Sequence, residues 1–176
     1  MVLQASQIAI MDAGKDLMSV KEGLVTLKDG FELSYNYEVG GANKAAKAID
    51  AAAKSGDKDV TLEALQAITL NGVELRLEDN SIIERALELA GKMQGSSSGA
   101  MRTQAKLGLR LAPLAAQGVE GEILGELSGA LSEFIDGGKT LSIVMSPKAP
   151  LPVSSLTELK DGSLSFKDLG FSAKTE

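Results

Sequence analysis

The chain of 176 residues contains no cysteine and no histidine. Without cysteine it can form no disulfide, no thiolate nucleophile and no cysteine-ligated metal site. Without histidine it lacks the commonest general base, the usual transition-metal ligand and the usual switch near neutral pH. We therefore expect a protein that is not an enzyme and that carries no metal and no other cofactor.

Aromatic residues are also scarce, at 3% with no tryptophan, so the core must be built from Leu, Ile, Val, Ala and Met. No apolar run approaches the ~20 residues of a membrane-spanning helix, and no charged-then-apolar leader with a cleavage site is evident. The sequence thus predicts no membrane span. The length favours a single domain over residues 1–176, which could also be excised from a longer chain.

Basic residues are fewer than acidic ones: the chain has 18 Lys and Arg and 24 Asp and Glu, which gives a net charge of −6. Nucleic-acid binding needs a concentrated basic surface, so this balance argues against a nucleic-acid partner. We expect a protein partner or self-association instead. A lipid or other apolar ligand is the alternative.

The stretch Ile68–Gln94 changes its hydrophobic period from two to about 3.6, which predicts a strand that leads into a helix. The apolar positions change parity at Asn71-Gly72. This change indicates either a two-residue turn or a β-bulge, and we favour the bulge. Ser81 and Glu84 fit a capping box at the helix start, and Gly95 should end the helix.

Alternating apolar residues predict further strands, and Lys28-Asp29-Gly30 carries the signal of a hairpin turn. The most regular alternation follows that turn directly. The expected strands cover residues 2–11, 20–27, 31–39 and 141–145, with a closing strand around Leu164, Phe166 and Phe171.

Helical spacing predicts a lightly packed, alanine-rich helix over 42–54 and a pair of helices over 100–116 and 122–135. A flexible joint is expected near 95–99. The inward residues of the pair should be Leu107, Leu111 and Leu114 on the first helix and Leu127, Leu131 and Phe134 on the second. The predicted fold class is α+β: a mostly antiparallel twisted sheet, helices packed on one face, and a helical hairpin inserted before the last strands.

Two groups of charged residues are candidates for a site. Arg102, Lys106 and Arg110 share one stripe of a helix, where they could bind a phosphate or an anionic lipid head group. The more ordinary interpretation is a solvated face paired with Glu122, Glu126 and Glu133. Glu78 and Asp79 form a carboxylate pair of the kind that hydrolases use, but their place at a helix start explains them as capping residues.

Residues 66–153 resemble segments of uncharacterised exported proteins of proteobacteria. The resemblance is carried by four stretches: L-x-L-E-D-N-S-I-I-E-R-A, M-R-T-Q, S-E-F-I-D-G-G-K-T-L-S-I and P-K-A-P-L-P-V. It implies a periplasmic or envelope location and kinship with AsmA-like sheet proteins that handle lipids. It carries no functional residue onto this chain.

We therefore expect a non-catalytic binding or scaffolding domain of a bacterial envelope assembly, located in the periplasm or cell envelope, with the cytoplasm as the alternative. The first alternative function is a carrier of an apolar or acyl-chain ligand, with Arg102, Lys106 and Arg110 near the mouth of its cavity. The second is a hydrolase that uses carboxylates alone.

Overall fold

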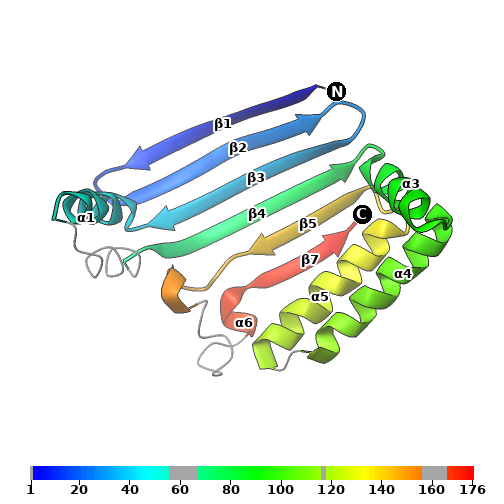
Figure 1. Ribbon diagram of the computed structural model, residues 1–176. Coiled ribbons are helices and arrows are strands. Elements are labelled where there is room, and N and C mark those ends of the chain that lie inside the picture. The colour runs from blue at the N-terminus through cyan, green and yellow to red at the C-terminus, as the bar shows by residue number, and fades with distance from the viewer. Residues whose placement is uncertain (1, 56–66, 116–117, 156–165) are drawn as a thin grey trace.

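The computed structural model describes residues 2–55, 67–115, 118–155 and 166–176. In these residues the strands form one seven-stranded sheet in which every pairing is antiparallel, and its order is β1-β2-β3-β4-β5-β7 with β6 beside β4 (Figure 1). The predicted α+β class is confirmed. The strands are β1 Leu3–Asp12, β2 Leu17–Leu27, β3 Phe31–Gly40, β4 Thr69–Asp79, β5 Thr140–Met145, β6 Leu151–Pro152 and β7 Phe171–Thr175.

The helices gather at two separate places (Figure 1). Helices α3, α4 and α5 are inserted between β4 and β5, and α5 lies beside β5 and β7, whereas α1 lies at the far end of the sheet. The predicted closing strand is confirmed at Phe171, which begins β7, but was wrong at Phe166, which begins the short helix α6; Leu164 falls outside the described residues. The helices are α1 Ala42–Ser55, α3 Ile82–Gln94, α4 Ser98–Leu111, the 3-10 helix η1 Ala112–Ala115, α5 Gly118–Ile135 and α6 Phe166–Leu169.

The strand register gathers the apolar residues on one face of the sheet. Leu33 of β3 stands opposite Leu77 of β4, and Leu77 stands opposite Leu141 of β5. Directly opposed residues in an antiparallel pair point to the same face. The alternating pattern of the sequence therefore produces an apolar face and a polar face across neighbouring strands.

The main core forms where α5 packs on the apolar face of β5 and β7. Phe134 is only 2% exposed and clusters with Ala130, Leu141 and Ala173. Leu127 and Leu131 pack against this cluster, so the predicted inward face of the second helix is confirmed. The core thus sits at one side of the sheet, and Figure 1 shows that β1, β2 and β3 lie on the other side of β4 from β5, β7 and α5.

Two bulges shape the sheet. Between β3 and β4 the register moves from Glu38 opposite Gly72 to Val39 opposite Leu70, so Asn71 is the extra residue and the predicted bulge is confirmed. A second bulge lies in β2 between Val20 and Gly23, where β2 has one residue more than either neighbour. Both bulges lie in strands inside the sheet.

Gly23 of the second bulge leaves room for the ring of Tyr35. A Cβ atom at Gly23 would stand only 2.4 Å from that ring. The hydroxyl of Tyr35 reaches across β2 and donates a hydrogen bond of 2.9 Å to Oε1 of Gln7 in β1. This glycine therefore lets β3 hold β1 through a side chain.

The start of α3 differs from the prediction. Ser81 has φ 120° and makes no capping bond with its side chain, because its hydroxyl donates to the carbonyl of Asp29 at 2.7 Å. Asp79 Oδ1 accepts the backbone N–H groups of Ser81 and Ile83 instead, at 3.0 and 3.3 Å. The prediction of a capping box was therefore wrong. The predicted end of the helix at Gly95 is confirmed, since Gly95 has a left-handed φ of 65°.

The packing face of α4 is also not the predicted one. Leu107, Leu111 and Leu114 are 57%, 53% and 79% exposed, whereas Met101 is buried. Residues at i and i+4 share one helix face, and Ala105, one turn after Met101, is half-buried. The side of α4 that carries Met101 and Ala105 is therefore the packed one, and the leucine stripe faces outward.

Candidate functional site

The basic stripe predicted as a ligand site is mostly used within the fold. Arg102 Nη2 lies 2.5 Å from Glu84 Oε2, and its Nη1 donates to the carbonyl of Ile135. Lys106 pairs with Asp136. Because α4 and α5 pack as a hairpin, the start of α4 meets the C-terminal end of α5, where free carbonyls attract cations.

The observed acidic partners of the stripe are therefore Glu84 and Asp136, and not the predicted glutamates of α5. Glu126 instead accepts the backbone N–H of Ala173 at 2.8 Å and so fastens α5 to β7. The acidic partners Glu84 and Asp136 are about half exposed, and such pairs each contribute roughly 0–1 kcal/mol. These cations mainly hold the helices together.

Arg110 borders an open groove of about 490 Å³ between α4 and α5. Its walls are mostly polar or small, with Gly125, Ser128 and Gly129 on the α5 side. The outward leucines of α4 do not line this groove. Arg110 also borders a smaller open hollow of about 250 Å³, where Leu107 is the one large apolar residue among those that line it. Neither depression has the enclosed apolar walls that bind an acyl chain.

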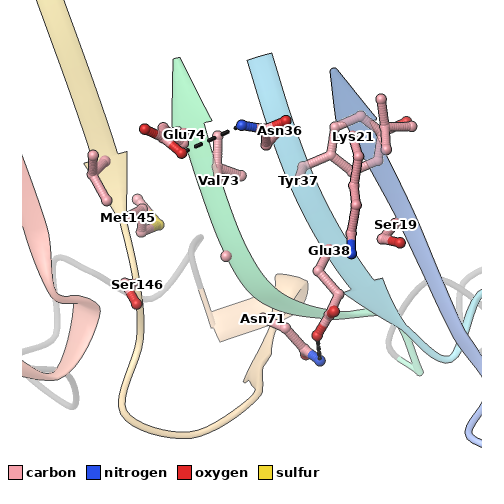
Figure 2. Close-up of a pocket in the computed structure, with 13 residues that line it drawn as sticks. Ser19, Lys21, Asn36, Tyr37, Glu38, Asn71, Val73, Glu74, Met145 and Ser146 are labelled. Carbon is pink, nitrogen blue, oxygen red and sulfur yellow. Dashed lines mark hydrogen bonds between the residues drawn. The ribbon is translucent and has the colours of Figure 1, made fainter. Parts of the chain in front are cut away.

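The polar face of the sheet has a shallow hollow of about 360 Å³ across β2 to β5 (Figure 2). Asn36 Nδ2 donates to Glu74 Oε2 at 3.4 Å, and Asn71 Nδ2 donates to Glu38 Oε1 at 3.0 Å. Figure 2 shows each carboxylate directed at its own amide. This arrangement spaces the two acids along the face and joins neighbouring strands.

Catalytic carboxylates must converge on one substrate atom, and the Glu78 and Asp79 pair does not. The two residues are consecutive in β4, so their side chains point to opposite faces of the sheet. Asp79 is occupied as the cap of α3. In the residues that the structure describes, no three Asp or Glu side chains gather closely enough to hold a metal ion.

The strand β1 forms one edge of the sheet and is exposed along its whole length of ten residues. Leu3 is 64% exposed and Met11 48% on the apolar face, while Ile8 and Ile10 are about half exposed on the other face. Roughly half of the backbone N–H and C=O groups of an edge strand point away from the sheet. Both the backbone and the side chains of β1 are therefore available to another chain.

Natural proteins protect such edges with charges, proline, bulges or short strands. The segment from Val2 to Met11 has no charged residue and no proline, and the nearby bulge lies in β2. The opposite edge differs, because β7 has five residues and carries Lys174. The β1 edge is thus the unprotected one.

Sequence reasoning predicted a strand at residues 2–11 but did not identify it as a site. The alternation of Ile8 and Ile10 with smaller residues is equally typical of an interior strand. The signal that was present is the absence of charge from Val2 to Met11, which becomes meaningful only once the strand order makes β1 an edge.

None of the helices that the structure describes is both long and apolar enough to cross a membrane. No curated protein and no solved structure matches the chain. A family model described as an uncharacterised protein matches residues 24–176, a range that leaves out β1 and the first part of β2. The chain therefore belongs to this family of uncharacterised proteins.

Proposed function

We propose that the protein is a non-catalytic binding or scaffolding domain of a bacterial envelope assembly, and that it binds another polypeptide through its β1 edge. The single observation that supports this proposal is the exposed strand β1 at that edge, which carries no charge from Leu3 to Met11. An added strand would satisfy the outward backbone groups and cover apolar side chains on both faces. The envelope setting rests on the resemblance of residues 66–153 alone.

The other two functions have no comparable observation in their favour. A carrier needs an enclosed apolar cavity, yet the leucines at 107, 111 and 114 face solvent and α5 packs directly on β5 and β7. A carboxylate hydrolase needs two converging acids, and Glu78 and Asp79 diverge. Binding through an edge strand requires neither feature.

Photo-cross-linking tests the proposal in extracts of the cells that make the protein. A photoreactive amino acid in place of Ser6 should give a discrete adduct, since this position lies in β1. The same group in place of the exposed Glu88 of α3 should not give that adduct. Adding Ile8→Lys and Ile10→Lys should abolish the adduct, because lysines on an edge strand disfavour the addition of another strand.

A matched control makes the same kind of substitution, two exposed apolar residues to lysine, on helix α4 instead of β1. Leu107 and Leu111 are exposed to nearly the same extent as Ile8 and Ile10, so Leu107→Lys with Leu111→Lys should leave the adduct intact. Equal adducts from Ser6 and Glu88, or an adduct that survives the β1 lysines, would contradict the proposed binding edge. Peptide mass spectrometry of the adduct identifies the bound chain.

A further inference from the structure

We infer that the chain bound at the β1 edge is a second copy of this protein, paired antiparallel to β1 about a two-fold axis at Gln7. This inference rests on the proposed function and names its partner. It joins the two sheets into one continuous sheet whose apolar faces lie on the same side. The argument uses charge, symmetry and the two-sided pattern of β1.

Charge favours a copy of the same strand. The protein has a net charge of −6, which opposes the approach of two copies, but the segment from Val2 to Met11 is neutral. Pairing β1 with itself therefore places no like charges opposite each other along this segment. The edge at β7, with Lys174, would place positive charges across such an axis.

Symmetry restricts the register. When two identical strands pair antiparallel about a two-fold axis perpendicular to the sheet, opposed residues must have the same parity, or the faces would be reversed. An axis at Gln7 pairs Leu3 with Met11 of the second copy and Ala5 with Ala9. All residues from Leu3 to Met11 then have a partner, and Asp12 falls outside this segment.

The same register suits the side chains on both faces of β1. The exposed Leu3 and Met11 become cross-strand neighbours on the apolar face, with the small Ala5 and Ala9 between them. On the other face Ile8 stands opposite Ser6 of the second copy, and Ile10 opposite Gln4. This register places no side chain from Leu3 to Met11 opposite a charged residue.

Because the chain has no cysteine, single introduced cysteines give an unambiguous map of this pairing. Purified Gln7→Cys protein should form a covalent dimer with a short thiol cross-linker, since position 7 of one copy lies opposite position 7 of the other. Ala5→Cys and Ala9→Cys should cross-link poorly alone, because residue 5 lies about 13 Å along the strand from its own copy. A mixture of the two variants should give the mixed dimer.

Lys174→Cys on the β7 edge is the control and should remain monomeric under the same conditions. Adding Ile8→Lys and Ile10→Lys to Gln7→Cys should prevent its cross-link, while circular dichroism shows unchanged folding. Dimers of Ala5→Cys alone and of Ala9→Cys alone, without the mixed dimer, would indicate parallel pairing. That result would overturn the inferred register.

The outcomes separate this inference from the proposed function. A Gln7→Cys protein that stays monomeric, together with a Ser6 adduct to a different protein, would overturn the second copy and retain the binding edge. A monomeric Gln7→Cys protein with no adduct from Ser6 would overturn both. A cross-linked Gln7→Cys dimer together with a Ser6 adduct of dimer mass supports both.

Discussion

Replacing Phe134 with alanine should lower the free energy of unfolding by about 3–5 kcal/mol. Phe134 is 2% exposed and contributes the largest side chain of the cluster that joins α5 to β5 and β7. Its removal leaves a cavity between Ala130, Leu141 and Ala173, and the small alanines cannot fill the space. Chemical denaturation followed by circular dichroism measures the change.

Leu114→Ala is the matched control for this effect. Leu114 is also a large apolar residue of the helical region, but it is 79% exposed. Its replacement should change the free energy of unfolding by less than about 0.5 kcal/mol. A loss at Phe134 no larger than the loss at Leu114 would contradict the position of the core beneath α5.

Gly170→Ala should destabilise the protein by roughly 2–4 kcal/mol, because two separate penalties act there. Gly170 has φ 53°, a conformation that residues with a Cβ atom adopt at a cost. A Cβ atom at this position would also stand 2.1 Å from the carbonyl oxygen of Ser146. The Ser146 N–H donates to the carbonyl of Gly170, so the backbone at the two positions is held close.

Gly129→Ala provides the opposite expectation in the same measurement. Gly129 lies inside α5, outside the left-handed region of φ, and a Cβ atom added there would meet no other atom within 4 Å. Alanine there should therefore stabilise the protein by about 0.5–1 kcal/mol through helix propensity. Equal effects at Gly170 and Gly129 would contradict the close contact between the ends of β5 and β7.

Local patterns predicted most of the sheet because a strand's alternation directly reflects its two faces. The change of parity at Asn71 identified the bulge, since one extra residue must move the apolar positions from even to odd numbers. The left-handed end of α3 at Gly95 was predicted for a similar local reason. These features depend on neighbouring residues only.

The features that the sequence did not predict depend on contacts between distant segments. Helical spacing shows that Leu107, Leu111 and Leu114 share a stripe, but α3 and α5 decide that the side of Met101 is buried. Ser81 matched a capping box, but the carbonyl of Asp29, distant in the sequence, accepts its hydroxyl group. The partners of Arg102 likewise follow from the packing of α4 against α3, which carries Glu84, and against α5, which ends at Ile135.

The candidate binding edge also depends on contacts between distant segments, which the sequence did not predict. The sequence of β1 predicts a strand, but only the strand order makes that strand an edge. The basic stripe is apparent from the sequence because three cations stand at helical spacing. Two of these cations form ion pairs within the fold, whereas β1, uncharged from Leu3 to Met11, is exposed along its whole length.

Hydrogen–deuterium exchange at the amides of Leu3–Met11 tests the central claim most directly. In the purified protein at high concentration, the outward amides of β1 should be protected by the partner strand, and dilution should increase their exchange. The variant with Ile8→Lys and Ile10→Lys should exchange quickly at every concentration. Exchange in the unmodified protein that is independent of concentration and as fast as in this variant would contradict pairing at the β1 edge.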